Sequence, residues 1–320
     1  MQGRIVPANA EWIEEAGGLL RSGALVAFPT ETVYGLGADA TNGEAVARVF
    51  AAKGRPSFNP LIVHVLGLEQ AVIIGSFSAT ARRLTEAFWP GPLTLVVPRI
   101  ETTDVSELVS AGLPTVALRS PDHPVARQLL KAAQRPIAAP SANLSGHVSA
   151  TRAEHVAADL GDRAAVILDA GQTPRGLEST VVSLTGAAPV LLRPGAISAD
   201  AIEKVLGEKI ARASESGEHL TSPGQLRSHY APNSRIRLNA TAWEPHEAVL
   251  AFGAVEEHPA KATINISPSG DLIEAAANLF AALRKLDGSG AATIAVTPIP
   301  AHGLGEAIND RLARAAAPRD

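Results

Sequence analysis

The chain has 320 residues, of which 46% are hydrophobic and 19% are charged. This length allows a large core and two domains, and the composition is that of a folded protein rather than a disordered one. The formal net charge is -4, which excludes a chain-wide binder of polyanions, so that any nucleotide or nucleic-acid site must be a local basic patch. The sequence has no cysteine, which excludes disulfides, thiolate metal sites and cysteine nucleophiles.

The N-terminus has no apolar signal core, and no apolar run reaches the roughly 18 residues that a membrane span needs. We therefore expect a soluble cytoplasmic protein without a membrane partner.

In chain order, apolar spacing and Gly/Pro punctuation predict helices that alternate with short strands. Helices are expected over residues 10–21, 43–52, 68–74, 78–88, 125–133, 152–160 and 198–206, the last capped by Ser198. Strands are expected over residues 24–28, 61–65, 93–97, 115–119, 136–140, 164–169, 180–184 and 190–192. This alternation predicts an α/β fold.

Residues 29–64 hold two polar, Gly/Pro-rich segments joined by the helical segment 43–52. Lys53 and Arg55 follow that helix directly, beside a glycine and a proline, so their charged ends can converge on one spot. An ammonium and a guanidinium together suit a polyanion such as a nucleotide phosphate chain. Cations at a helix C-terminus also complement its dipole, and this pair alone leaves both interpretations open.

Polar residues recur at the ends of the expected strands. They are Thr32, Arg119, Ser141, Asn143, Ser179, Thr180 and Arg193. Each alone is typical of a turn or a cap, but loops at strand ends of an α/β scaffold are where binding and catalysis concentrate. Their recurrence predicts one shared site.

After a first domain over residues 1–206, the composition becomes charged and Ser-rich, which predicts a linker over 207–234. Strands over 235–238, 248–252, 263–266 and 293–296 and a helix over 272–286 then predict a smaller α/β domain over 235–320. Its polar loops contain no acid/base pair or metal-like cluster, so we expect a structural or gating role.

Six blocks of the sequence, taken together, resemble a known family. PTETVYGLG, KGRPSFNPL, WPGPLTLV, ALRSPDHP, APSAN and STVV–LLRPG are similar, in this order and spacing, to the YrdC-like L-threonylcarbamoyladenylate synthases in their two-domain form. The match covers about residues 10–197 and resumes at 222–232, whereas the C-terminal part matches mainly in length and strand pattern. The resemblance implies a twisted α/β sheet with a concave basic cavity, and a Rossmann-like C-terminal domain joined by a lid-like linker.

The activity implied by this resemblance is a nucleotidyl transfer. L-Threonine, bicarbonate and ATP would give threonylcarbamoyl-AMP and pyrophosphate, with Mg2+ arriving on ATP, because no carboxylate cluster suggests a metal site in the protein. A downstream tRNA threonylcarbamoyl transferase would then form N6-threonylcarbamoyladenosine at position 37 of tRNA.

The resemblance also implies residue roles. The basic and polar group at the reacting nucleotide would be Lys53, Arg55, Ser141 and Asn143. ATP contacts would come from Arg55, Asn59, Thr115, Asn143, Thr151, Arg193 and Tyr230, and L-threonine contacts from Thr32, His64, Arg119, Ser141 and Ser179. Arg119 suits the amino-acid carboxylate, and His64 is either a general base or a neutral hydrogen-bond partner.

The linker motif departs from the commonest family pattern, which resembles SPGM-(K/R)-Y-(K/R)-HYAP. Here residues 222–232 read SPGQLRSHYAP, so the cations expected at 226 and 228 are missing and only Arg227 is basic between them. A lid that excludes water and an ordinary Pro-bounded linker both remain open.

Two other functions would require different features of the sequence. A non-catalytic module that binds double-stranded RNA or a nucleotide would use the same basic cavity, but the net charge of -4 opposes strong RNA binding. A carbamoyl transferase like the hydrogenase-maturation proteins would carry zinc-finger cysteines, which this chain lacks. A free-standing synthase, with at most weak RNA binding, is therefore predicted.

Overall fold

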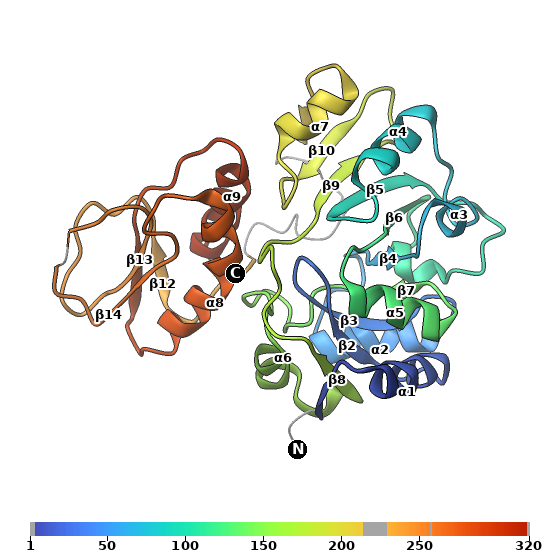
Figure 1. The fold of residues 1–320 in the computed structure, drawn as a ribbon, viewed down its shortest axis with the longest axis horizontal. Coiled ribbons are helices and arrows are strands. Elements are labelled where there is room, and N and C mark those ends of the chain that lie inside the picture. The colour runs from blue at the N-terminus through green and yellow to red at the C-terminus, as the bar shows by residue number, and fades with distance from the viewer. Residues whose placement is uncertain (1–3, 214–228, 257, 319–320) are drawn as a thin grey trace.

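The computed structural model describes residues 4–213, 229–256 and 258–318. Figure 1 shows two α/β bodies: a larger one built from the N-terminal part of the chain and a smaller one, in orange and red, built from the C-terminal part. The predicted α/β class with two domains is confirmed.

The larger body is built on a mixed sheet with the strand order β1-β8-β2-β3-β7-β4-β6-β5-β9-β10-β11. Its strands are β1 Ile5–Pro7, β2 Val26–Pro29, β3 Tyr34–Asp39, β4 Ile62–His64, β5 Leu93–Pro98, β6 Thr115–Arg119, β7 Ile137–Ala138, β8 Val166–Asp169, β9 Thr180–Ser183, β10 Val190–Arg193 and β11 Ala211–Arg212. Its helices are α1 Ala10–Arg21, α2 Gly43–Lys53, α3 Leu68–Ala71, α4 Ala79–Phe88, α5 Pro124–Ala133, α6 Ala153–Leu160 and α7 Ala199–Leu206, with 3-10 turns η1 Glu107–Ser110 and η2 Gly161–Arg163.

Helices cover both faces of this sheet. Because successive side chains of a strand point to opposite faces, each strand contributes to a core on either side. Along β2, Val26 and Phe28 join the apolar core formed with α1 and α5. Ala27, between them, joins the opposite core, to which α2, α4, α6 and α7 contribute. With both faces of the sheet covered, the ends of the strands and the loops that follow them are where the site lies.

The second glycine-rich half of PTETVYGLG is a strand rather than part of a polar segment. Residues 34–37 begin β3, which is buried throughout and pairs antiparallel with β2. A Cβ on Gly37 would lie 2.8 Å from the Phe28 ring and 2.9 Å from the Ile137 side chain. The glycine therefore permits close packing and does not mark a turn.

Three further predictions of local structure were inaccurate. The helix expected over 68–74 covers only Leu68–Ala71, and the strand expected over 136–140 covers only Ile137–Ala138. Prolines at 136 and 140 lack the N–H that a sheet needs, which limits that strand. The helix α9 Leu304–Ala316 was not predicted, although Leu304, Ile308 and Leu312 follow helical spacing.

The smaller body is a four-stranded parallel sheet in the order β12-β15-β13-β14, flanked by α8 Leu272–Asp287 and α9. Its strands are β12 Arg235–Arg237, β13 Ala248–Ala251, β14 Ala262–Asn265 and β15 Thr293–Val296. Parallel strands with crossover helices agree with the predicted Rossmann-like arrangement.

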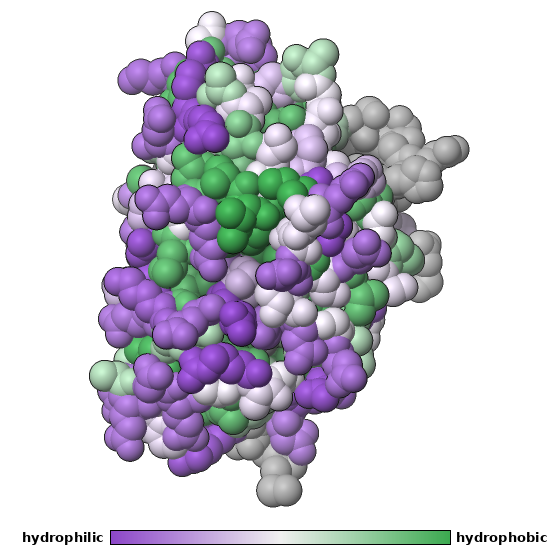
Figure 2. All heavy atoms as spheres, turned by 90° about the vertical axis from the view of Figure 1, so that its right-hand side faces the viewer, coloured by the Kyte–Doolittle hydropathy of each residue, from purple (hydrophilic) through white to green (hydrophobic). Residues whose placement is uncertain are grey.

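Hydrophilic and hydrophobic residues are unevenly distributed on one face of the larger body (Figure 2). Figure 2 shows that the side lying to the right in Figure 1 is mostly hydrophilic, with one compact hydrophobic patch. Ile73, the second residue after α3, is 65% exposed. Within the described residues, no helix combines the length and the apolar character that crossing a membrane requires.

Candidate active site

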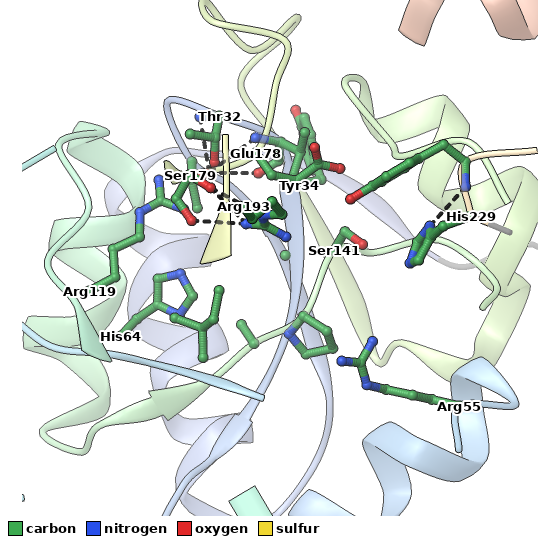
Figure 3. A pocket seen from close by; sticks show the side chains of 17 residues that line it. Thr32, Tyr34, Arg55, His64, Arg119, Ser141, Glu178, Ser179, Arg193 and His229 are labelled. Carbon is green, nitrogen blue, oxygen red and sulfur yellow. Dashed lines mark hydrogen bonds between the residues drawn. The ribbon is translucent and has the colours of Figure 1, made fainter. Parts of the chain in front are cut away.

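A pocket lies where several strands of the large sheet begin or end, and polar and charged side chains line much of it. Its lining residues are Thr30, Thr32, Val33, Tyr34, Gly35, Arg55, Ile62, His64, Arg119, Ala139, Pro140, Ser141, Glu178, Ser179, Arg193, His229 and Tyr230. Of the seven polar strand-end residues, the pocket brings together five and leaves out Asn143 and Thr180. In Figure 3, Arg119 and His64 lie on one side and Arg55 and His229 on the other.

We call the group Thr32, His64, Arg119 and Ser179 the sheet wall, and Arg193 lies between this wall and the opposite side of the pocket (Figure 3). The cation of the sheet wall is Arg119, whose Nη2 lies 2.7 Å from Glu31 Oε1. Both side chains are almost fully buried, and the contact lacks hydrogen-bond geometry, so Nε and Nη2 of Arg119 keep hydrogen-bonding capacity. Burial would raise the pKa of Glu31, but the Arg119 charge and the Asp122 N–H outweigh it and lower that pKa.

Hydroxyl groups complete the sheet wall, and the guanidinium of Arg193 contacts one of them. Thr32 Oγ1 lies 2.8 Å from Thr30 Oγ1, and Ser179 Oγ lies 2.7 Å from Thr94 Oγ1. Arg193 Nη2 donates to the carbonyl and the hydroxyl of Ser179, at 2.8 and 3.1 Å. A carboxylate and a substrate hydroxyl could both find donors here.

His64 is an uncharged part of this wall. It is buried at the end of β4, in edge contact with the Phe28 ring, and its Nδ1 has no hydrogen-bond partner among the described residues. Burial, followed by the charge of Arg119, lowers the pKa of His64 to about 3. A general base works best with a pKa near the operating pH, so the geometry favours the neutral hydrogen-bond partner over the general base.

The opposite side, which we call the loop wall, consists of Arg55, Ser141, His229 and Tyr230. Gly54, with φ of 59°, ends α2 in the left-handed conformation and turns the chain so that Arg55 reaches the pocket. Arg55 donates to the Asn59 carbonyl, the Asn59 side chain and the Pro60 carbonyl, at 3.0, 2.6 and 2.8 Å. Burial, with a smaller contribution from the charge of Arg193, lowers the pKa of Arg55 to about 9.

Lys53 lies behind the loop wall and is not among the residues that line the pocket. Its Nζ donates to the carbonyl of Ser141 at 2.6 Å and to that of Asn143. Burial, with a further contribution from Arg55, lowers the pKa of Lys53 well below its ordinary value. In this structure Lys53 therefore supports the 141–143 loop, and the convergence of both cations on one spot is not seen.

Four other predicted nucleotide residues do not line the pocket. Asn59 holds Arg55, and Asn143 donates to the carbonyls of Leu144 and His147. Thr151 contacts the His155 ring from its backbone N–H, and Thr115 begins β6, at the opposite end from Arg119. Their roles at ATP remain predictions.

The described part of the linker motif closes one side of the pocket. Tyr230 is buried with φ of 60°, and its ring stacks on Phe280 of α8 with centroids 5.6 Å apart. Burial lowers the pKa of His229 to about 3, so this histidine is neutral as well. Residues 222–228, including Gln225, Leu226, Arg227 and Ser228, lie outside the described residues.

Two buried carboxylates at the site were missed by sequence reasoning. Glu31 neutralises Arg119, and Glu178 lines the pocket, where it accepts from Ser149 and from Arg311 of α9. Glu31 lies inside PTETVYGLG, next to the predicted site residue Thr32, so its position in the sequence could have marked it as a site residue. Within the described ranges, no group of three His, Asp or Glu side chains could hold a metal ion.

Comparison with known proteins places the chain in context. The Sua5–YciO–YrdC family model, described as telomere recombination, matches residues 18–195, and a model for the C-terminal domain of threonylcarbamoyl-AMP synthase matches 197–317. A threonylcarbamoyl-AMP synthase of Pyrococcus abyssi is 42% identical over 95% of this chain and 94% of the relative. One of Bacillus subtilis is 43% identical over 97% of this chain and 94% of that relative.

A solved structure agrees with these matches. The crystal structure of Pyrococcus abyssi Sua5 complexed with L-threonine superposes with a TM-score of 0.90 at 39% identity, and the alignment covers 99% of this chain and 98% of that one. The likeness thus includes both domains and not the larger sheet alone. The chain belongs to the Sua5/YrdC family, in the form that carries the Sua5 C-terminal domain.

Proposed function

We propose that this protein is a threonylcarbamoyl-AMP synthase, which converts ATP, L-threonine and bicarbonate into threonylcarbamoyl-AMP and pyrophosphate. The observation that carries the proposal is the full-length likeness, across both domains, to relatives that bear this name. The pocket supports it, because one wall offers a neutralised arginine with hydroxyls and the other an arginine without an acidic partner. This catalytic function is favoured over the non-catalytic RNA- or nucleotide-binding module.

The sheet wall would bind L-threonine. The free donors of Arg119 suit its carboxylate, since charge-assisted bonds from a guanidinium are directional and strong. Hydroxyls of Thr32 and Ser179 can contact the substrate amine and hydroxyl. His64, neutral at pH 7, can accept a hydrogen bond from the amine without competing for its proton.

The loop wall would bind the nucleotide. Arg55, whose buried guanidinium donates to neutral oxygen atoms alone among the described residues, is suited to phosphate oxygens. Arg193 and the ring of Tyr230 border the same space. Lys53 would act by fixing the loop that carries Ser141, and it is close enough in sequence to Arg55 to add positive potential.

The chemistry requires two additions. The threonine ammonium first gives up one proton to solvent. The free amine then attacks the carbon of bicarbonate, which forms a carbamate and releases water. A carbamate oxygen then attacks the α-phosphorus of ATP, and pyrophosphate leaves with the electron pair of the broken P–O bond. Negative charge grows in both steps, so positioning and fixed cations account for most of the expected rate enhancement.

Mg2+ is proposed to arrive with ATP. The described residues provide no carboxylate cluster, and Glu31 and Glu178 are already paired with arginines. The ion would therefore be held mainly by phosphate oxygens, where it neutralises the leaving pyrophosphate.

We further propose that the product is consumed in the cytoplasm by a tRNA threonylcarbamoyl transferase acting at adenosine 37. RNA contact by this chain would be weak, because its net charge is -4.

Pyrophosphate release by the purified protein tests the proposal. ATP and Mg2+ are supplied with L-threonine and bicarbonate, and each of the two is omitted in turn. Release that requires both is expected. Release that is independent of threonine, or none at all together with tight binding of a double-stranded RNA probe, would replace the synthase by the binding module.

A further inference from the structure

The C-terminal body places one fully buried arginine at the wall of the pocket. Arg311 belongs to α9, yet its side chain is 0% exposed and reaches the larger body. Nε donates to Glu178 Oε2 at 2.8 Å, and Nη2 donates to the Pro194 carbonyl at 2.9 Å. Its guanidinium also lies over the Tyr230 ring, 5.1 Å from the centroid. Nη1 is paired with the neighbouring carboxylate of Asp310. Of these four partners, Glu178 and Tyr230 line the pocket.

These contacts flank the pair formed by Arg193 and Ser179. Glu178 precedes Ser179 in the chain, and Pro194 follows Arg193. The two segments are pressed together at Gly195, where an added Cβ would lie 2.5 Å from the Glu178 carbonyl oxygen. Arg311 thus contacts both segments through Glu178 and Pro194. These two are the chain neighbours of Ser179 and Arg193, which line the pocket.

The contact between Arg311 and Glu178 also changes the charge at the pocket. Glu178 is buried at the pocket, and a bare carboxylate there would repel a nucleotide. Burial would raise the pKa of Glu178, but the charges of Arg311 and Arg193 outweigh it. With Arg311 removed, Arg193 would be the arginine left among the described residues to balance Glu178, and it would be drawn away from Ser179.

We propose that Arg311 is a positioning residue for the nucleotide side of the pocket, through which the docked C-terminal domain completes the active site. It touches no substrate itself. It neutralises Glu178 and fixes the 178–179 and 193–194 segments, so that Arg193 stays directed at the pocket. This rests on the proposed function and gives the C-terminal domain a role in it.

The experiment compares Arg311→Met with a variant that weakens domain docking elsewhere. Arg284 of α8 also bridges the two bodies, with Nη2 2.7 Å from Asp159 Oδ2, but it does not line the pocket. Arg311→Met is expected to lower kcat/KM for ATP by about tenfold or more, whereas Arg284→Met stays within about threefold of the unchanged protein. Melting temperatures are measured for both, so that loss of folding is seen directly.

A charge-matched double variant separates positioning from general stability. Adding Glu178→Gln to Arg311→Met removes the orphaned carboxylate, and we expect it to recover about threefold or more of the lost kcat/KM. Glu306→Gln, at the partly exposed Arg212–Glu306 pair, weakens another contact between the two bodies away from the pocket and is expected to stay within about threefold of the unchanged protein. If Arg311→Met does not fold, Arg311→Lys replaces it, because lysine keeps the charge but cannot contact both segments.

Three results would overturn the inference: a folded Arg311→Met or Arg311→Lys protein within about threefold of the unchanged kcat/KM, an equal loss in Arg284→Met, or no recovery in the double variant. Failure of the proposed function is distinguishable, because it would show as absent pyrophosphate release in the unchanged protein.

Discussion

The two walls of the pocket treat their positive charge in opposite ways. On the sheet wall, Arg119 is paired with the buried carboxylate of Glu31. On the loop wall, Arg55 and the supporting Lys53 contact carbonyl and amide oxygens, and within the described residues neither forms an ion pair. One wall is close to neutral, whereas the other holds the buried guanidinium of Arg55 without a carboxylate partner among the described residues.

This difference matches the charges of the two proposed ligands. A zwitterionic amino acid brings one carboxylate and one ammonium, and it needs direction more than net attraction. ATP brings several negative charges, and buried cations without a carboxylate gain most from them. The contrast suggests that the walls are specialised, and each prediction below changes the charge or the hydrogen bonds of one wall.

The largest effect is expected from the loop wall. Arg55→Ala should reduce pyrophosphate release by about a thousandfold, or about 4 kcal/mol, because it removes the buried charge proposed to bind phosphate. Lys53→Ala should have an effect of the same order, because the loop that carries Ser141 loses its support. Arg48→Ala, on the solvent-exposed side of the same helix α2, is the matched control. Near-normal release by either active-site variant would show that the loop wall is not the phosphate side.

The next effect concerns the neutralised wall. Glu31→Gln leaves Arg119 buried without its counter-charge, which should destabilise the protein by about 3 kcal/mol. L-Threonine should then raise the melting temperature of this variant more than that of the unchanged protein, because its carboxylate supplies the missing charge.

Glu44→Gln, in the exposed pair with Arg48, should change stability by less than about 0.5 kcal/mol. An equal thermal shift with threonine in Glu31→Gln and in the unchanged protein would separate Arg119 from threonine binding.

The sequence predicts the walls better than it predicts their charge balance. Arg119 and His64 end apolar strands, so position alone marks them as site candidates. Whether a cation is neutralised depends on contacts between distant segments. Glu178 and Arg311 are 133 residues apart and meet only because the two domains dock. Lys53 resembles Arg55 in the sequence, but its side chain turns toward the Ser141 carbonyl, which no local pattern encodes.

A property shared by both walls should appear in acid. His64 and His229 are buried, and their pKa values lie near 3, below the unfolded value of 6.5. The unfolded chain therefore binds more protons below pH 6.5, and stability is lost as the pH falls from 6.5 toward 3. Each histidine should cost about 1.4 kcal/mol at pH 5.5.

Urea unfolding at pH 7.5 and 5.5 measures this loss. His229→Gln should remove about 1.4 kcal/mol of the difference between the two pH values, whereas His246→Gln, at an exposed position, should leave it unchanged. An unchanged pH dependence in His229→Gln would show that His229 is not buried in the neutral form.

The smallest effect tests whether the walls act separately. Ser179→Ala removes a hydroxyl that contacts Thr94 and Arg193, but it keeps the Ser179 carbonyl, which also holds Arg193. The KM for L-threonine should rise by about tenfold, the value of one good hydrogen bond, while the KM for ATP changes by less than about threefold. Ser183→Ala, at the end of β9, is the control on the same strand. If both KM values rise equally, the hydroxyl serves the two ligands together, and the division into a neutral wall and a cationic wall describes charge but not substrate binding.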